Sequence, residues 1–250
     1  MKILDFSSLR ATCANCSINA LCLPHGISKA DMEKLDAMVR KSKPIAKGAV
    51  LFRAGEPLDS LYLVRSGSLK VQLQTESGDE QIIGFFLPGE LMGLDALGTH
   101  HHTCTAKALE ISSICNLPYD ELSDICSHVP ALHESLMRLI GMEITAEQEL
   151  LLSINQRQAL GRVAAFLLAL SHRFQRLHYS PREFRLTMSR YELGNYLGLT
   201  IETVSRAVSR LQQDGLIKVD RRSIRILNPE GLQEICQGEP VAVSLHRCSG

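Results

Sequence analysis

Residues 189–211 read SRYELGNYLGLTIETVSRAVSRL, and this stretch decides how the C-terminal part of the chain folds. Two short helical segments meet at Gly198, and Thr200 is placed to cap the second segment. Apolar residues recur at helical spacing along the second segment, which predicts the side facing a core: Val204, Val208 and Leu211. Two helices joined by a short glycine turn predict a helix-turn-helix.

Three polar side chains share the outward face near the start of the second helix. Glu202, Ser205 and Arg206 are spaced i, i+3 and i+4. In a recognition helix these positions meet base edges in the major groove of DNA. Arginine pairs with guanine through two hydrogen bonds, and a carboxylate accepts one from cytosine. The alternative is a surface salt bridge between Glu202 and Arg206, but the turn glycine, the cap and the local charge favour DNA contact.

The flanking sequence predicts the rest of a winged helix domain. Residues 156–176 have the pattern of an amphipathic helix. Residues 215–220 and 223–227 predict a β-hairpin wing, with Arg221 and Arg222 at its tip available for phosphates. From residue 155 to 226 there are thirteen lysines and arginines against five acids, so this part has a charge of +8 and the remainder −8. The basic part indicates a polyanionic partner.

The N-terminal half has a different pattern. After a short helix over 28–41 capped by Ser28, the apolar period changes to two. Short apolar runs are separated by glycine-containing turns, and this predicts an antiparallel β-roll or jelly roll that forms the sensor body. The predicted strands lie in the runs 50–52, 61–64, 69–73, 82–86 and 111–117.

A long helix is predicted from residue 131, with one stripe of side chains at steps of three or four. The stripe consists of Leu136, Ile140, Ile144, Glu147, Leu151 and Ile154. It predicts either a core helix with one exposed acid or a two-fold dimer helix in which Glu147 faces its own symmetry mate. Two like charges ~4 Å apart at an effective dielectric of ~20 repel by about 4 kcal/mol. A dimer of this kind would be marginal, so a small structural input could decide it.

A cysteine run near the N-terminus reads CANCSINALC from Cys13 to Cys22, with Cys16 between them. Three thiolates at this spacing suit zinc or an iron-sulfur cluster, and unliganded cysteines are the other alternative. A fourth ligand would come from farther along the chain. The remaining candidates are Cys104, Cys115, Cys126, Cys236 and Cys248.

Length and composition limit the class of protein to which the chain can belong. The chain has 250 residues, of which 45% are hydrophobic and 22% are charged. This length and composition predict a soluble protein of two domains. No stretch approaches the ~20 apolar residues of a membrane span, and the first residues do not resemble a secretory signal. We therefore expect a cytoplasmic protein whose eight cysteines are ligands or thiols rather than disulfides. No enzyme is predicted, because Cys104 with His100 or His102 would be the only plausible catalytic group.

These residues resemble the CRP/FNR superfamily of bacterial transcription factors, and within it the FNR/ANR-type oxygen-sensing regulators. The likeness runs from about Cys13 to about Asn228. Besides the cysteine run, it depends on LYLVRSG (61–67), GDEQI (78–82) and GNYLGLTIETVSR (194–206). Taken together, these motifs are highly specific.

The resemblance implies an oxygen-labile [4Fe-4S] cluster and a homodimer that regulates anaerobic genes. The cluster ligands would be Cys13, Cys16, Cys22 and Cys115. Glu202, Ser205 and Arg206 match the family's base-reading residues, which implies a double-stranded palindrome like TTGAT-N4-ATCAA. Glu147 stands where the best-known member of the group has Asp at the dimer interface. RNA polymerase is the expected partner on DNA, with the turn around Gly78 as one candidate contact.

The expected fold is therefore α+β. Its parts are a cysteine-rich cluster-binding segment (1–27), an antiparallel β-roll sensor domain of the cyclic-nucleotide-binding type (28–130), a long dimerisation helix (131–155) and a C-terminal winged helix-turn-helix DNA-binding domain (156–250). No cyclic nucleotide is expected, because His102-Thr103 replaces the Arg-Ser pair that would bind its phosphate and no arginine lies between Arg65 and Arg138. The histidine run 100–102 predicts a solvated polar loop, with haem ligation as the alternative. A structural zinc site is the alternative for the cysteines.

Overall fold

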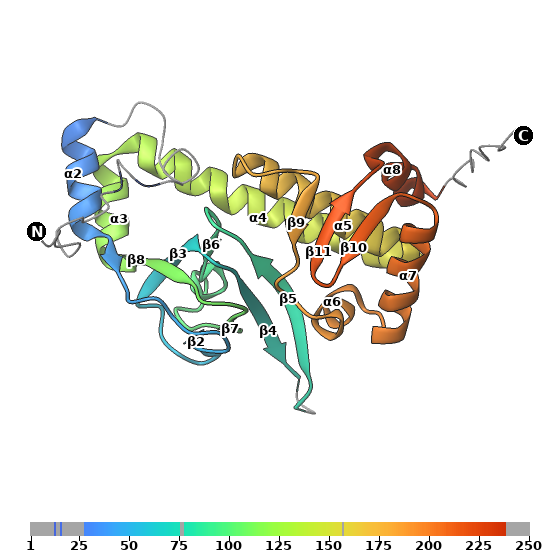
Figure 1. The fold of residues 1–250 in the computed structure, drawn as a ribbon. Helices are drawn as coiled ribbons and strands as arrows, with labels where there is room; N and C mark the ends of the chain where they lie inside the picture. The colour runs from blue at the N-terminus through green and yellow to red at the C-terminus, as the bar shows by residue number, and fades with distance from the viewer. Residues whose placement is uncertain (1–12, 14–15, 17–27, 76–77, 157, 239–250) are drawn as a thin grey trace, which may run out of the picture. The chain divides into compact units, whose positions relative to one another are not determined.

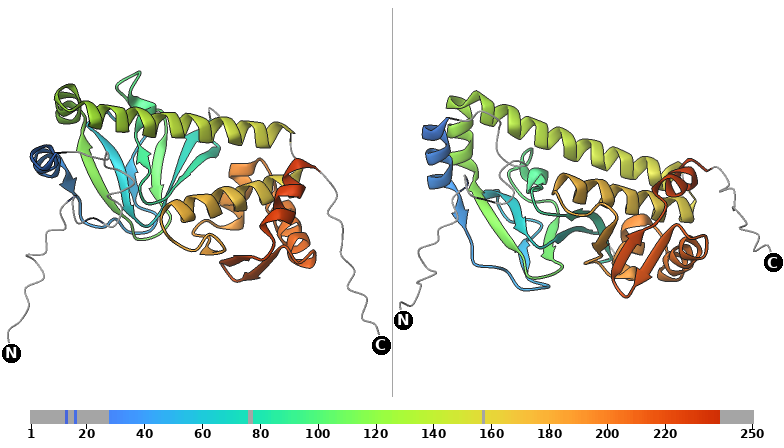
Figure 2. Two further views of the ribbon diagram at one scale, coloured as in Figure 1. Left: turned by 90° about the horizontal axis from the view of Figure 1, so that it is seen from above. Right: turned by 45° about the horizontal axis from the view of Figure 1, so that its top comes forward.

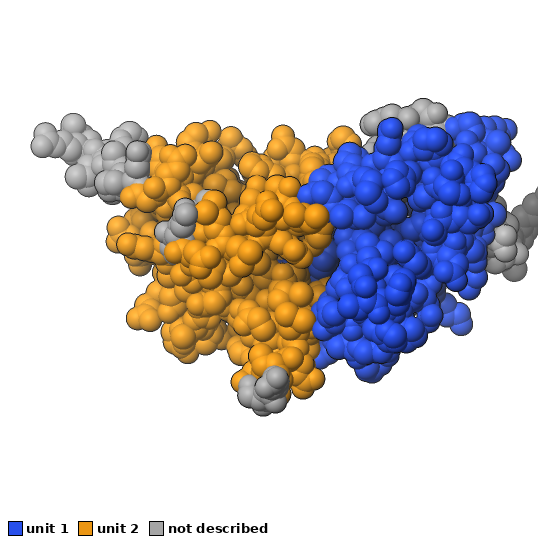
Figure 3. All heavy atoms as spheres, turned by 180° about the vertical axis from the view of Figure 1, so that it is seen from behind, with its two compact units in different colours: residues 1–69, 85–142 blue, residues 70–84, 143–250 orange. Residues whose placement is uncertain are grey.

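Strands dominate the first half of the chain and helices the second half (Figure 1). The computed structural model describes residues 13, 16, 28–75, 78–156 and 158–238. The chain divides into two compact units, coloured separately in Figure 3. Unit 1 comprises Met1–Leu69 and Phe85–Met142, and unit 2 comprises Lys70–Gly84 and Glu143–Gly250.

Unit 1 is built around an antiparallel sheet with the strand order β1-β8-β3-β6. Strand β8 pairs with β3 along its whole length, from Ser60 opposite Pro118 to Ser66 opposite Ser113, and β2 pairs with β7. The elements of this unit are α2 (Lys29–Met38), β1 (Arg40–Lys41), β2 (Val50–Phe52), β3 (Ser60–Ser66), β6 (Leu91–Met92), the 3-10 turn η3 (Leu94–Ala96), β7 (Thr105–Ala108), β8 (Ser113–Pro118) and α3 (Tyr119–His128).

The core of unit 1 comes from the period-two pattern of these strands, because alternate side chains point to the same face. The fully buried members include Phe52, Leu61, Met92 and Ile114. Gly67 forms the turn after β3 with a φ of +82°, and a Cβ there would collide with Ser112 Oγ. Only glycine therefore fits this turn without displacing its neighbours.

Three elements cross the boundary between the units. Strands β4 (Leu69–Gln74) and β5 (Glu80–Phe86) are neighbours, and β5 is an edge strand among the described strands. Helix α4 (Pro130–Gln156) is the third. Residues 70–84 belong to unit 2 although they lie within the predicted β-roll domain, and the predicted domain limits stay a prediction.

Figure 2 shows the remaining elements of unit 2 gathered together, and they enclose a hydrophobic core. They are α5 (Ala159–Arg176), β9 (Glu183–Arg185), α6 (Arg190–Leu197), α7 (Ile201–Gln213), β10 (Ile217–Asp220), β11 (Ser223–Ile226) and α8 (Pro229–Gln237), and the strand order is β10-β11-β9. Helix α5 packs against both α7 and α8. Fully buried side chains from different elements meet here, including Leu167, Leu193, Leu211, Leu216 and Leu232.

The α+β class and the winged helix-turn-helix are confirmed, and most predicted elements are present. The first helix is shorter than expected, since α2 ends at Met38. Helix α8 was not predicted. Its start signals are nevertheless in the sequence, because Asn228 Oδ1 accepts from Gly231 N at 2.9 Å and a proline follows at the first helical position. No described helix combines the length and low polarity needed to cross a membrane.

Candidate nucleic-acid interface and cysteine site

Helix α6 begins at a capping box, in which two backbone donors are satisfied by side chains. Ser189 Oγ accepts from the backbone N–H of Glu192 at 3.2 Å, and Glu192 Oε2 accepts from that of Ser189 at 2.8 Å. Burial alone would raise the pKa of Glu192, but the Ser189 N–H and the nearby Lys70 ammonium outweigh it and lower the pKa. The helix ends at Gly198 in the left-handed conformation, with a φ of 64°.

The turn from α6 to α7 is tight. A Cβ on Gly194 would lie 2.6 Å from the backbone oxygen of Leu199, so a side chain there would force the two helices apart. Thr200 caps α7, since its Oγ1 accepts from Thr203 N at 3.2 Å. The tight turn and the cap therefore fix the orientation of α7 relative to α6.

Helix α7 has one buried and one exposed side. Val204, Ala207, Val208 and Leu211 are buried, whereas the predicted base-reading residues are all exposed. Those residues are Glu202, Ser205 and Arg206. Hydrogen bonds from its own backbone N–H and from Thr200, together with Arg206, lower the pKa of Glu202, so it is ionised at neutral pH. Farther along α7, Arg210 is paired with Asp214 at 2.9 Å.

The wing adds exposed cations on the same unit. Strands β10 and β11 pair from Ile217 opposite Ile226 to Asp220 opposite Ser223, which leaves Arg221 and Arg222 as the loop. Both are exposed. Arg221 has a φ of 53°, a conformation that costs a non-glycine residue about 1 kcal/mol or more. Arg222 Nη1 donates to Thr187 O at 3.3 Å, which holds this side chain at the base of the wing.

The predicted cysteine ligands lie in different kinds of structure. The backbone N–H of Cys13 donates to Asp36 Oδ1 of α2 at 2.8 Å, and that of Cys16 donates to Cys13 O at 3.2 Å. Cys115 is buried in β8, opposite Lys41 of β1 and Leu63 of β3. Cys22 lies outside the described residues. Within the described residues, no three His, Cys, Asp or Glu side chains are grouped to hold a metal ion.

The predicted dimer stripe lies along α4 and is half exposed in the single chain. Ile144 is 50% exposed and Leu151 is 60% exposed. Glu147 between them is also exposed, whereas Leu136, Ile140 and Ile154 are half-buried. Leu152, with 48% exposure, adds to the exposed apolar surface of this helix. Exposed apolar surface of this kind marks an interaction site.

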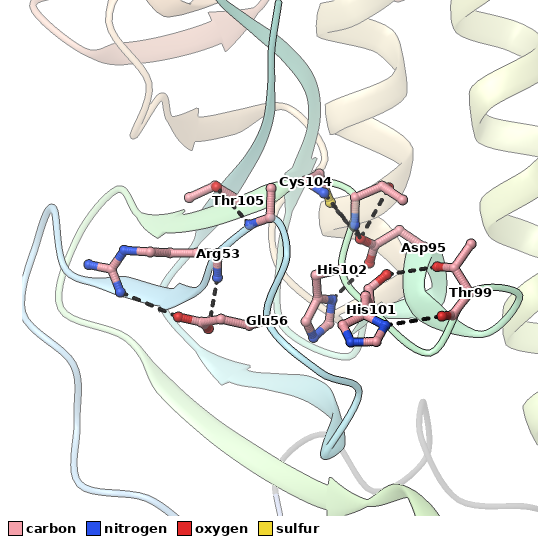
Figure 4. Close-up of polar contacts among 10 residues, drawn as sticks. Arg53, Glu56, Asp95, Thr99, His101, His102, Cys104 and Thr105 are labelled. Carbon is pink, nitrogen blue, oxygen red and sulfur yellow. Dashed lines mark hydrogen bonds and ion pairs between the residues drawn. The ribbon is translucent and has the colours of Figure 1, made fainter.

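A polar cluster forms around Asp95 of η3, with His102 and Cys104 buried, Asp95 half-buried and Thr103 exposed (Figure 4). Asp95 Oδ2 accepts from Thr103 N at 2.8 Å and from Cys104 Sγ at 3.1 Å, and its Oδ1 lies 3.3 Å from His102 Nδ1. Burial alone would raise the pKa of Asp95, but the hydrogen bonds from Cys104, Thr103 and His102 outweigh it and lower the pKa. Burial and Asp95 together strongly raise the pKa of Cys104, so its thiol stays protonated.

This cluster corrects one expectation about the histidine run. His100 and His101 are exposed, as the predicted loop requires, but His102 is buried, with its ring stacked 3.9 Å from that of Phe52. The histidine follows an alternating pattern with Cys104 and Ala106, which is the signal that sequence reasoning missed. The Asp95 carboxylate accepts from the Thr103 N–H next to His102, which places a negatively charged group beside these residues.

Known families match both halves of the chain. A cyclic nucleotide-binding domain matches residues 42–129, and a Crp-like helix-turn-helix domain matches residues 161–235. The fumarate and nitrate reduction regulatory protein of Escherichia coli (strain K12) is 45% identical over 223 residues, which are 89% of each chain. The protein of that name from Salmonella typhimurium is 46% identical over 220 residues, 88% of each chain.

Solved structures agree with these matches. FixK2 from Bradyrhizobium japonicum has a TM-score of 0.72 at 27% identity, covering 82% of this chain and 98% of its own. A CRP/FNR family transcriptional regulator from Thermus thermophilus, TTHA1359, has a TM-score of 0.62 at 22% identity, covering 80% of this chain and 100% of its own, which shows the fold alone. With the exposed face of α7, these likenesses define a DNA-binding transcription regulator rather than an enzyme. The chain belongs to the CRP/FNR family.

Proposed function

We propose that the chain is a cytoplasmic, oxygen-responsive regulator of anaerobic genes whose homodimer binds a TTGAT-N4-ATCAA-like palindrome. The observation that carries the proposal is the exposed trio Glu202, Ser205 and Arg206 on a helix whose other side is buried. The names of the relatives, which refer to fumarate and nitrate reduction, support the link to anaerobic genes. RNA polymerase is the proposed partner at the promoter.

We assign recognition of the DNA bases to the N-terminal part of α7. The Arg206 guanidinium would donate two hydrogen bonds to guanine O6 and N7, and the ionised Glu202 would accept from cytosine N4. The exposed Arg221 of the wing would contact phosphates, which fix register without reading bases. A palindrome requires two such helices about one DNA turn apart, which a two-fold dimer supplies.

Dimerisation is assigned to the stripe on α4. Covering Ile144 and Leu151 with the partner's helix would remove apolar surface from water. The same contact would bring Glu147 close to Glu147 of the partner subunit, and the like charges oppose association. The balance between these two effects makes the dimer sensitive to small changes in how α4 is supported.

The proposed cofactor is a [4Fe-4S] cluster held by Cys13, Cys16, Cys22 and Cys115. A set of four cysteine thiolates fits such a cluster chemically, and it also fits zinc, which is the alternative. When bound, the cluster supplies an oxygen-labile centre. Cys115 is fixed in the sheet by β1 and β3, and Cys13 is held to α2 through Asp36. These residues would tie the N-terminal segment to unit 1.

The proposed response to oxygen depends on whether the cysteine segment is held against unit 1. While the cysteine segment is held against unit 1, we propose that it supports α4 in the dimer. When oxygen releases the segment, the support is lost and the repulsion between the two Glu147 side chains prevails. No cyclic nucleotide takes part in this proposal, because His102-Thr103 stands in place of the expected Arg-Ser pair and Asp95 already accepts from Thr103 N.

Metal content and DNA binding test the proposal together. Protein purified without oxygen should contain about four iron and four sulfide per chain, lose them in air, and bind the palindrome only before exposure. Cys13→Ala should abolish both properties, whereas Cys126→Ala, at a buried cysteine on α3 outside the proposed set, should leave both unchanged. Zinc without sulfide, and DNA binding that is insensitive to air, would contradict the oxygen response and favour the alternative.

A further inference from the structure

Side chains join the β4–β5 hairpin to helix α6 within unit 2, and Figure 1 shows the ribbons of β5 and α6 near each other. The Asn195 side chain on α6 makes two hydrogen bonds to strand β5. Its Nδ2 donates to Glu80 O at 2.7 Å, and its Oδ1 accepts from Ile82 N at 2.5 Å. In return, Gln81 Nε2 donates to the backbone oxygen of Asn195 at 2.6 Å. We call these contacts, with the Lys70–Glu192 ion pair described below, the hairpin latch.

The pattern of these bonds resembles strand pairing. In a β-strand the C=O of one residue and the N–H of the residue two positions on point to the same side, and an edge strand leaves them without a strand partner. The amide of Asn195 offers one donor and one acceptor in a plane, as a peptide group does. It therefore caps the edge of β5 as a neighbouring strand would, at Ile82, which is only 3% exposed.

An ion pair strengthens the same junction. Lys70 Nζ on β4 lies 3.1 Å from Glu192 Oε1 on α6, and the two side chains are only 15% and 20% exposed. The Arg225–Glu183 pair elsewhere in unit 2 is 53% and 50% exposed. A shielded pair is screened less by salt than a surface pair, and removal of one partner leaves the other charge partly desolvated. Glu192 also belongs to the capping box, so the pair acts on the start of α6.

The latch holds the helix that sets the direction of the recognition helix. Gly194 lies one residue before Asn195, and its close approach to Leu199 couples α6 to α7. The hairpin is continuous with unit 1 through Leu69 and Phe85. We propose that Asn195 is a positioning residue for DNA binding, which together with Gln81 and Lys70 holds the helix-turn-helix on the β4–β5 hairpin so that α7 is preorganised for the groove.

This inference depends on the DNA binding proposed above, so its test needs one measurement that does not involve DNA. Asn195→Ala removes the two hydrogen bonds from the helix side chain to the β5 backbone. The hairpin-side variant, Lys70→Met/Gln81→Ala, removes the ion pair and the Gln81 hydrogen bond without changing any residue of the helix-turn-helix. Gln233→Ala, at an exposed amide on α8, is the matched control. The measurements are amide hydrogen exchange at Ile82 and the affinity of oxygen-free protein for the palindrome.

We expect exchange at Ile82 to become about tenfold faster in Asn195→Ala, because its acceptor is lost. Both latch variants should bind the palindrome about tenfold more weakly, because less of the free protein holds α7 ready, and the control should match the wild type. Unchanged exchange, or wild-type affinity in the hairpin-side variant, would overturn the latch. If Asn195→Ala does not fold, the hairpin-side variant decides. A wild-type protein that fails to bind the palindrome would refute the proposed function and the positioning role with it.

Discussion

Replacement of Glu147 by leucine should shift the chain toward the dimer in air. Glu147 lies on the exposed stripe of α4 between Ile144 and Leu151. In the proposed dimer its carboxylate faces that of the partner subunit. Glu149→Leu is the matched control, because Glu149 is also exposed on α4 but lies about 200° around the helix from Glu147.

The two opposing effects are similar in size. Full burial of an Ile or Leu side chain contributes roughly 1.5–3 kcal/mol. Ile144 and Leu151 are 50% and 60% exposed, so about half of that remains to be gained, or roughly 3–6 kcal/mol for the four side chains of a dimer. Two carboxylates ~4–8 Å apart at an effective dielectric of ~20 repel by about 2–4 kcal/mol. Removal of the repulsion should therefore tighten the dimer by roughly 30- to 1000-fold.

Sedimentation equilibrium in air measures the dimer dissociation constant directly. Glu147→Leu should be largely dimeric at concentrations where the wild type and Glu149→Leu are monomeric. Added salt should strengthen the wild-type dimer by screening the repulsion, and should have much less effect on Glu147→Leu. If both leucine variants dimerise equally, general hydrophobicity rather than the position of Glu147 is responsible, and the reasoning fails.

Three further predictions concern other residues. Arg206→Ala should weaken binding to the palindrome by about 1–3 kcal/mol per half-site, with little change on a scrambled duplex, as fluorescence anisotropy would show. Gly194→Ala should lower the free energy of unfolding by about 1–3 kcal/mol because of the contact with Leu199 O. Gly141→Ala, with open space around the new Cβ, should raise the free energy of unfolding by about 0.5–1 kcal/mol. Denaturant unfolding measures both changes. Asp95 has a lowered pKa in the folded chain, so it stabilises the fold above its unfolded pKa and loses this contribution as pH falls through the folded pKa. Asp95→Asn should therefore lose less stability than the wild type on acidification from about pH 5 to pH 3 in urea unfolding.

Local signals in the sequence predicted the helix-turn-helix well, because its caps and turn depend on neighbouring residues. Thr200, Gly198 and the apolar spacing of α7 act over a few positions, and the structure confirms their roles. Contacts between distant segments gave no such signal. Asn195 and Glu80 are 115 residues apart, and nothing in either stretch indicates that they meet.

The same distinction explains the histidine run. Its composition predicts a polar loop, but His102 is buried: Asp95, seven residues away, lies 3.3 Å from its Nδ1, and Phe52, fifty residues away, stacks on its ring. The roles of the cysteines, the base-reading residues and the dimer stripe stay predictions, since they concern a bound cofactor, DNA and a second chain.

Asp95 has a wider consequence for how this regulator receives information. Its carboxylate accepts from the Thr103 and Cys104 N–H donors, within the residues that match a cyclic nucleotide-binding domain. The β-roll thus supplies the anion that these two donors bind. A diffusible nucleotide would have to displace a covalently attached competitor, whose effective concentration is very high. These two N–H donors are therefore closed to an outside anion unless the carboxylate moves.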